Sequence, residues 1–187
     1  RIGTRKSKLA LAQTEMFANA LKKRFDDIDT EIVCISTKGD KILDKPLAMI
    51  GGKGVFISEL ENALLSGEAD MAVHSAKDLP LELADGLEIS SALQRGNYRD
   101  VLVARKNNPI QNREDFIVGT GSLRRQSFIK KIYPLVCIKD IRGNVDTRLG
   151  KLMNGDYDGI ILAAAGLERL SLYNSADYDI MPFEYKD

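Results

Sequence analysis

The chain has no tryptophan, one histidine and two cysteines among its 187 residues. A single histidine, His74, without a C-x-x-C pair does not supply the ligand set of a zinc site. Cys34 and Cys137 lie in short apolar runs, I-V-C-I-S and L-V-C-I-K, so we expect two buried, reduced thiols. The sequence therefore indicates neither a metal centre nor a disulfide framework.

Net charge and long apolar runs are also missing. The chain has 27 basic and 27 acidic residues, whereas a general nucleic-acid-binding domain is usually strongly basic. No apolar run approaches the roughly 18 residues that suggest a membrane span, and the opening R-I-G-T-R does not resemble a secretory signal. We expect a monomeric cytoplasmic protein without nucleic-acid or membrane partners.

The order of apolar patterns predicts an α/β fold. Short β-branched runs alternate with segments whose apolar residues recur every three or four positions, which favours layers of helices around mainly parallel sheets. Ser7 is a suitable cap for the first helix. The expected strands lie at 1–4, 31–36, 71–74, 87–93, 101–104, 117–119, 135–138 and 159–162, and the expected helices at 8–25, 56–65, 123–133, 145–153 and 163–170.

A polar, turn-rich stretch at 94–100 (Q-R-G-N-Y-R-D) predicts a domain boundary. We expect one α/β domain at 1–95 and a second at 96–187, with a ligand cleft between them, because ligands of open α/β sheets bind at the carboxyl ends of strands. The final F-E-Y-K-D shows no closing element, so we expect an incomplete chain.

The strongest functional signal is a basic segment in the second half. From Gly121 to Lys151 there are eight Lys or Arg against two Asp, although the chain as a whole is neutral. The segment contains G-T-G-S-L-R-R-Q at 119–126 and R-G-N-V-D-T-R-L at 142–149. Glycine turns that open helices favour anions, and arginine binds carboxylate or phosphate with two parallel hydrogen bonds.

These arginines have a structural alternative, because each could be an ordinary surface charge. Arg124 and Arg125 are expected in the first turn of a helix, where the helix dipole disfavours cations unless an anion offsets them. Arg142 and Arg148 repeat the arrangement, and Arg5 and Arg169 can add to the cluster. The coincidence of these residues with strand-to-helix junctions favours a small polyanion as the ligand.

A second polar group follows the expected strand at 71–74, in M-A-V-H-S-A-K-D-L-P. We expect His74 to be a hydrogen-bonded residue at the strand end. Lys77 and Asp78 are either a turn with a local ion pair or an anion clamp beside an acid/base carboxylate.

The glycine-rich stretch G-G-K-G-V-F at 51–56 lacks the spacing of a nucleoside-triphosphate loop and the Ser or Thr after Gly-Lys. We interpret it instead as part of a long loop, 37–54, that covers the ligand, with Lys53 and Phe56 at its end.

In order along the chain, these segments resemble porphobilinogen deaminase (hydroxymethylbilane synthase). Seven short motifs spread over nearly the whole chain carry the resemblance: R-I-G-T-R-K-S-K-L-A-L-A-Q at 1–13, G-D-K-I-L-D-K-P-L at 39–47, G-G-K-G-V-F at 51–56, A-V-H-S-A-K-D-L-P at 72–80, G-T-G-S-L-R-R-Q at 119–126, R-G-N-V-D-T-R-L at 142–149 and Y-D-G-I-I-L-A-A-A-G-L-E-R-L at 157–170.

The resemblance implies two periplasmic-binding-protein-like α/β domains facing a cleft, and a third α+β domain that this chain lacks. It implies a transferase of porphyrin biosynthesis that condenses four porphobilinogen molecules, with release of ammonia, into linear hydroxymethylbilane. The growing chain is held on a dipyrromethane cofactor, which a cysteine of the third domain binds covalently. Porphobilinogen carries acetate and propionate groups, which suits a cleft with several arginines.

By motif match, the resemblance assigns catalysis to Asp78, whose carboxylate stabilises the cationic character of the pyrrole after ammonia is lost. Lys53 and Phe56 fall on the active-site loop. Cofactor binding is assigned to Ser7, Lys77, Asp78, Ser122, Arg124, Arg125 and Arg169, and substrate binding to Arg5, Arg142 and Arg148.

This sequence departs from the family pattern in two ways. Met49 stands where many members carry a lysine in the loop. The chain also ends before the third domain, and neither Cys34 nor Cys137 matches the attachment motif, so the 187 residues alone are expected to be an inactive fragment.

Two other functions compete with the transferase. A non-catalytic, two-lobed carrier of a small anion would have the same fold and the same arginines. A nucleic-acid binder that uses the basic segment would need steeply salt-dependent binding, and the lack of tryptophan and the scarcity of nearby aromatic residues count against it.

Overall fold

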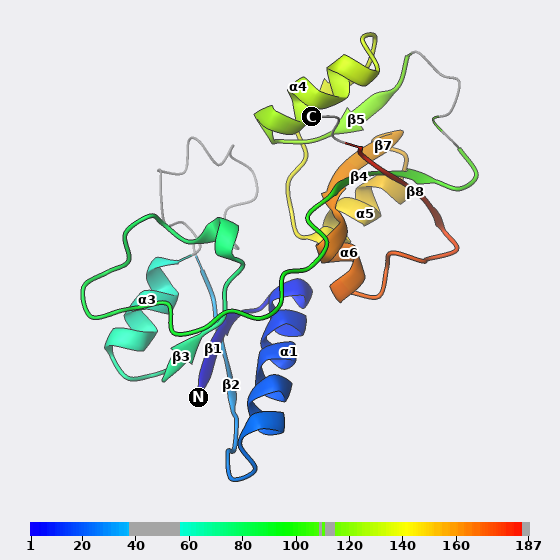
Figure 1. Cartoon of the computed structure of the whole chain (residues 1–187). Coiled ribbons are helices and arrows are strands. Elements are labelled where there is room, and N and C mark those ends of the chain that lie inside the picture. The colour runs from blue at the N-terminus through cyan, green and yellow to red at the C-terminus, as the bar shows by residue number, and fades with distance from the viewer. Residues whose placement is uncertain (38–56, 109, 111–114, 185–187) are drawn as a thin grey trace. The chain divides into compact units, whose positions relative to one another are not determined.

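The computed structural model describes residues 1–37, 57–108, 110 and 115–184 of the chain (Figure 1). The chain divides into two compact units, Arg1–Gln94 and Arg95–Asp187. Each unit has its own sheet, and the sheet in each is covered by helices. Within the described ranges, no helix combines the length and apolar character that crossing a membrane requires.

The sheet of the first unit has three parallel strands in the order β2-β1-β3. The strands are β1 (Ile2–Arg5), β2 (Ile32–Ile35) and β3 (Met71–Ala72). Two helices, α1 (Lys8–Arg24) and α3 (Ser58–Leu65), accompany it, and a 3₁₀ turn at Ala76–Asp78 follows β3.

Helix α1 begins at the predicted residue and ends one residue before the predicted limit, 25. The Ser7 hydroxyl accepts a hydrogen bond from the backbone N–H of Ala10, which caps the first turn. Three basic residues, 22–24, lie in the last turn, where the helix dipole favours positive charge.

Alternate residues of β1 face the two helices. The hydroxyls of Thr4 and Thr14 hydrogen-bond at 2.7 Å, so the Thr4 side faces α1. A Cβ atom on Gly3 would lie 3.3 Å from Leu60, so the Gly3 side faces α3. Because successive residues of a strand point to opposite faces, the two helices cover opposite sides of this sheet (Figure 1).

The second unit has a five-stranded mixed sheet in the order β6-β5-β7-β4-β8. Strand β5 runs parallel to β6 and β7, whereas β4 runs antiparallel to β7 and β8. The strands are β4 (Asp100–Arg105), β5 (Ile117–Gly119), β6 (Cys137–Lys139), β7 (Gly159–Ala163) and β8 (Tyr178–Pro182), and the helices are α4 (Leu123–Ile132), α5 (Val145–Met153) and α6 (Ala164–Arg169).

Strand β4 lies inside this sheet and contributes to both faces of its core. Val101 and Val103 pack with Leu149 and Leu152 of α5 and Leu167 of α6. Leu102 and Ala104 face the opposite side, where they pack with Ile129 of α4 and with Phe116 and Phe183. All four strand residues are at most 1% exposed, so α5 and α6 cover one face of the sheet and α4 covers the other.

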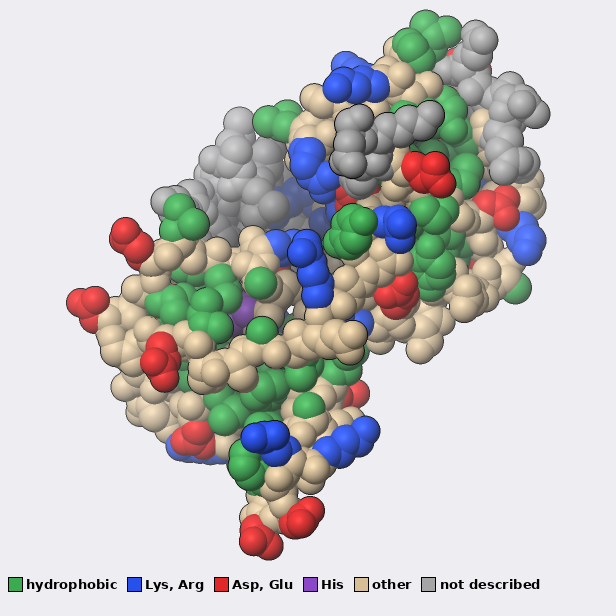
Figure 2. Space-filling view, in the orientation of Figure 1, with side chains coloured by type: hydrophobic (Ala, Val, Ile, Leu, Met, Phe, Trp, Pro, Cys, Tyr) green, Lys and Arg blue, Asp and Glu red, His purple; other side chains and the backbone are tan. Residues whose placement is uncertain are grey.

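The predicted α/β class is confirmed, and most predicted elements are found within a residue or two. Strand β5 and helix α5 have the predicted limits. The predicted strand at 87–93 is wrong, because this segment pairs with no described strand and leaves Ile89 65% and Leu93 40% exposed. Figure 2 shows that hydrophobic side chains do reach the surface on the face it draws.

Two further expectations are corrected. The sheet of the second unit is mixed rather than mainly parallel. Cys34 and Cys137 are free and exposed, not buried, and each lies on a strand at the edge of its sheet, β2 and β6 respectively.

Candidate anion-binding site

The basic residues of the second unit gather where its parallel strands end. Strands β5, β6 and β7 run in one direction, so their carboxyl ends share one edge of the sheet. The loops after β5 and β6 touch there, because the backbone N–H of Thr120 donates to Lys139 O at 3.0 Å. A Cβ atom on Gly121 would lie 2.6 Å from Asp140 Oδ1, so a larger residue at this position would displace the Asp140 side chain.

Arg124 and Arg125, in the first turn of α4, share one buried carboxylate. Arg124 Nη2 lies 2.6 Å from Asp100 Oδ2, and Arg125 Nη2 lies 2.7 Å from Asp100 Oδ1. Arg125 also donates from Nε to Oδ1 and from Nη1 to Ile161 O. The side chains of Arg124, Arg125 and Asp100 are 63%, 15% and 4% exposed, so Arg125 is not a solvated surface charge.

Asp100 is the functional candidate that the sequence prediction missed. It begins β4, and its partner in the antiparallel ladder is Ala163, the last residue of β7. The start of β4 therefore lies at the same edge as the carboxyl ends of the parallel strands. The only signal in the sequence was a single acidic residue directly before the apolar run V-L-V-A. This signal indicates a functional position only when the direction of the strand is known.

Arg142 and Arg148 flank the start of α5. Arg148 Nε donates to Gly143 O at 2.7 Å, which folds this side chain back over the first turn of the helix. Lys151 Nζ donates to Arg142 O at 3.2 Å. Nη1 of Arg142 is buried and has no hydrogen-bond partner among the described residues. A buried donor without a partner is costly, so an acceptor from a ligand would stabilise this site.

The electrostatics of this edge also favour an anion. Burial lowers the pKa of Arg148 from its ordinary value, repulsion from Arg125 and Arg142 lowers it further, and Asp140 partly opposes these effects. The guanidinium groups of Arg125 and Arg142 thus both lie close enough to repel that of Arg148. Carboxylates, which arginine binds through paired hydrogen bonds, fit this donor set, and so do the acidic side chains of a dipyrromethane.

The two other predicted residues of this unit have different surroundings. Ser122 occupies the N-cap position of α4, but its hydroxyl makes no capping hydrogen bond. Arg169 is the last residue of α6, and its Nη2 atom would be 3.4 Å from a Cβ atom on Gly96. The structure therefore brings together four of the predicted basic residues, Arg124, Arg125, Arg142 and Arg148, through direct contacts or electrostatic interactions.

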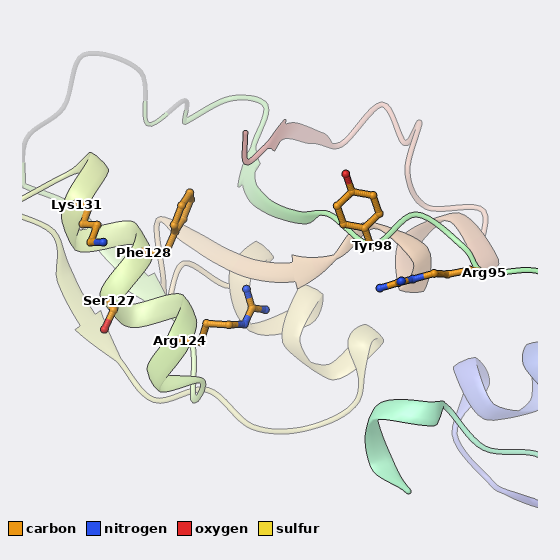
Figure 3. Close-up of a pocket in the computed structure, with 6 residues that line it drawn as sticks. All are labelled: Arg95, Tyr98, Arg124, Ser127, Phe128 and Lys131. Carbon is orange, nitrogen blue, oxygen red and sulfur yellow. The ribbon is translucent and has the colours of Figure 1, made fainter. Parts of the chain in front are cut away.

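A shallow pocket of about 600 Å³ adjoins α4. Figure 3 shows Arg124, Ser127, Phe128 and Lys131 projecting from this helix, while the remaining lining residues, Arg95 and Tyr98, come from the segment that leads into β4. Arg124 belongs both to this pocket and to the group held by Asp100. The lining includes two aromatic rings and three cationic side chains, and these charges attract anions.

The predicted residues of the first unit lie at the ends of β1 and β3. Arg5 ends β1 and Ser7 caps α1, while Lys77 and Asp78 are exposed in the 3₁₀ turn after β3. Gln13 Nε2 donates to Ser75 Oγ at 3.0 Å, which ties this turn to α1. Lys77 and Asp78, both described, form no ion pair with one another, so the carboxylate is not neutralised by its neighbour.

His74 lies between these groups. Burial lowers its pKa from the ordinary value, the Asp78 carboxylate opposes this shift, Arg5 adds to it, and Glu61 opposes it weakly. Arg5 and Asp78 are therefore both within electrostatic range of one imidazole. The predicted hydrogen bond to the His74 ring is not found among the described residues. Lys53, Phe56 and Met49 of the predicted loop lie outside the described residues.

Curated relatives share the sequence over most of this chain. A porphobilinogen deaminase from Bordetella parapertussis is 49% identical over 172 residues, which cover 91% of this chain and 55% of the relative. A porphobilinogen deaminase from Paraburkholderia phymatum is 48% identical, covering 91% of this chain and 53% of the relative. The chain thus spans about half the length of the curated relatives it matches.

Two solved structures also align with most of the chain. The periplasmic VFT2 domain of Bordetella pertussis BvgS is 19% identical with a TM-score of 0.46, covering 91% of this chain and 64% of that one. Substrate-binding domain 2 of Lactococcus lactis GlnP, in an open conformation, is 12% identical with a TM-score of 0.49, covering 97% of this chain and 76% of that one.

A sequence model described as "Porphobilinogen deaminase, dipyromethane cofactor binding domain" matches residues 1–185 of the chain. The match covers the basic edge of the second unit and the turn that holds Lys77 and Asp78. The chain belongs to the porphobilinogen deaminase family.

Proposed function

We propose that the protein containing this chain is a transferase, hydroxymethylbilane synthase. It condenses four porphobilinogen molecules stepwise, releasing ammonia, into a linear tetrapyrrole for porphyrin and heme biosynthesis. The proposal rests on family membership and on one observation, the cluster of Arg125, Arg142 and Arg148 at the carboxyl edge of the second sheet.

The second unit has the donors to hold a polycarboxylate. Arg142 has a buried Nη1 without a partner among the described residues, and Arg148 is half-buried near like charges. We assign these two residues to the carboxylates of incoming porphobilinogen. Ser122, Arg124, Arg125 and Arg169 would hold the carboxylates of the dipyrromethane, so the cationic edge binds both pyrrole groups by the same chemistry.

The first unit would provide the catalytic carboxylate and further anion-binding groups. Asp78 is exposed in the turn after β3, with no ion pair to Lys77, and so is accessible to a pyrrole N–H. An unneutralised carboxylate stabilises positive charge on the pyrrole as ammonia leaves, and it can also move the pyrrole proton. Arg5 would bind the substrate, and Ser7 and Lys77 would bind the cofactor.

When bound, the dipyrromethane supplies the pyrrole to which each new unit is joined. On the family resemblance we propose that the cysteine that binds it lies in a third domain, and we propose neither Cys34 nor Cys137 for that role. The same resemblance supports porphobilinogen and pyrrole-chain intermediates as partners, a monomeric state and a cytoplasmic location. Lys53 and Phe56 are proposed for the active-site loop on the same ground.

The test uses the complete gene product, with and without Asp78→Ala. Porphobilinogen consumption and ammonia release are measured on equal amounts of folded protein, and the intact mass reports whether dipyrromethane is attached. We expect the wild-type protein to carry the extra mass and to consume porphobilinogen. Asp78→Ala should lose turnover while keeping its circular dichroism spectrum.

Asp85→Ala is the matched control, because Asp85 is an exposed carboxylate of the same unit with no proposed role. It should retain the wild-type rate. Near-normal turnover by Asp78→Ala would contradict the catalytic assignment. Reversible binding of porphobilinogen by a wild-type protein without attached mass or turnover would favour the non-catalytic anion carrier.

A further inference from the structure

The position of Asp100 follows from the direction of β4. Strand β4 is antiparallel to β7, so its first residue lies beside the last residue of β7, Ala163. Helix α4 begins after β5, which is parallel to β7, and so it begins at the same edge. This topology places a carboxylate under the first turn of α4, where the helix dipole otherwise disfavours Arg124 and Arg125.

The two oxygens of Asp100 are divided between the two arginines. Oδ2 accepts from Arg124 Nη2 at 2.6 Å, while Oδ1 accepts from Arg125 Nη2 at 2.7 Å and from Nε at 3.1 Å. The other end of the Arg125 guanidinium is held by Ile161 O at 3.0 Å. Arg125 is thereby fixed at three nitrogens between β4 and β7, and Arg124 is fixed beside it.

Burial makes this arrangement rigid. Asp100 is 4% exposed and a buried carboxylate needs charged partners, so it does not release the arginines easily. Arg124 is 63% exposed, so the same contact anchors one edge of a guanidinium that otherwise faces solvent and the pocket of Figure 3. One negative and two positive charges leave the group cationic, which preserves attraction for an anion.

We propose that Asp100 is a positioning residue for the ligand site. It fixes Arg124 and Arg125 before the ligand arrives, so that their binding edges are already oriented towards pyrrole carboxylates. The inference rests on the proposed function, which assigns both arginines to the dipyrromethane. It adds a residue that does not itself touch the ligand but determines how two that do are held.

The first experiment follows cofactor uptake by the complete protein. Apo-protein is incubated with porphobilinogen, and the gain of dipyrromethane mass is timed for wild type, Asp100→Asn and Asp100→Glu, counting only folded protein. Loss of a residue that orients ligand-binding groups commonly costs roughly 10- to 100-fold, and we expect uptake by Asp100→Asn to slow by about that factor. Asp100→Glu keeps the charge and should recover part of the rate.

Asp70→Asn is the matched control, because Asp70 also accepts two hydrogen bonds from a guanidinium, that of Arg1, but lies in the first unit and is exposed. It should take up the cofactor at the wild-type rate. Wild-type uptake by folded Asp100→Asn would show that Asp100 has only a structural role. Faster uptake would show that its carboxylate competes with the ligand, and either result overturns the proposal.

A second measurement does not depend on the cofactor or on a variant that folds. In the ligand-free wild-type protein, the Nε–H signal of Arg125 should exchange slowly with solvent in an NMR spectrum, since that hydrogen is bonded to Asp100. Rapid exchange of this hydrogen and free rotation of the Arg125 guanidinium would refute the inference. If wild-type protein shows slow exchange but neither gains mass nor consumes porphobilinogen, the proposed function fails while the positioning of Arg125 stands.

Discussion

Two glycines of the same loop-and-helix segment should respond to alanine with opposite signs. Gly143 precedes α5 with φ of +111°, a region that disfavours side chains, and its added Cβ would lie 2.7 Å from Cγ2 and 2.8 Å from Cβ of Thr147. Gly150 lies within α5, and nothing is within 4 Å of its added Cβ. The same substitution therefore meets strain at one position and open space at the other.

The magnitudes follow from these environments. A left-handed backbone costs an alanine about 1–2 kcal/mol, and relieving the Thr147 contact adds about 1 kcal/mol, at the low end for overpacking because Thr147 is exposed. Alanine also lowers the conformational entropy of the unfolded chain, which stabilises the folded protein by roughly 0.4–1 kcal/mol. We expect Gly143→Ala to lower the free energy of unfolding by about 2 kcal/mol, and Gly150→Ala to raise it by about 0.5–1 kcal/mol through helix propensity.

Urea unfolding followed by circular dichroism, with the slope of the transition unchanged, measures both effects. A Gly143→Ala protein as stable as wild type would refute the argument from backbone conformation. A change of the same sign in both variants would show that a general property of alanine, not the local geometry, decides the outcome. Arg148 provides a local readout, because its Nε bonds to Gly143 O and should lose protection from exchange in Gly143→Ala alone.

Three other predictions concern single side chains. His74 has a lowered pKa in the folded state, so near and below the ordinary value of 6.5 the unfolded chain binds more protons than the folded one. The free energy of unfolding should therefore fall as the pH drops through 6.5. His74→Gln should remove this loss in urea titrations at several pH values. Leu152 is fully buried against the second sheet, and Leu152→Ala should cost about 2–5 kcal/mol in the same assay. Cys34 and Cys137 should both react with a thiol reagent in the native protein, whereas slow reaction would contradict their exposure.

Elements with strong local signals were predictable from the sequence. Helix α1 has a serine cap and basic residues in its last turn, and its observed range starts where the cap predicts. Strand β5 and helix α5 were predicted at their observed limits because a glycine turn separates each from its neighbour. In each case residues within a few positions determine the backbone conformation, so no tertiary information is needed.

Features that depend on distant contacts were not predictable. The short run at 87–93 was predicted to be a buried strand, but a strand requires a partner, and the described structure provides none for it. Periodicity does not show strand direction either, so the antiparallel course of β4 was missed. The predicted burial of the two cysteines was also wrong, because an apolar run of residues does not show that its strand lies at the edge of a sheet.

The candidate site shows the same division. The clustering of Arg142 and Arg148 beside Arg125 was expected from their places at strand-to-helix junctions, and their electrostatic coupling agrees with it. Their roles in binding stay predictions. Asp100 was not identified, because its importance arises only when an antiparallel strand brings residue 100 beside the start of a helix at residue 123.

The long-range pairing of β8 has a consequence for how the second unit assembles. β8 pairs with β4 between Val101 and Pro182, near opposite ends of the unit, whereas β5 and β6 pair between Ile117 and Cys137. Closing the longer loop costs more conformational entropy, so β8 should join the sheet after the segments between β5 and β7 have folded. Until it does, one edge of β4 is unpaired and able to join another chain, so aggregation during refolding should increase when β8 is weakened.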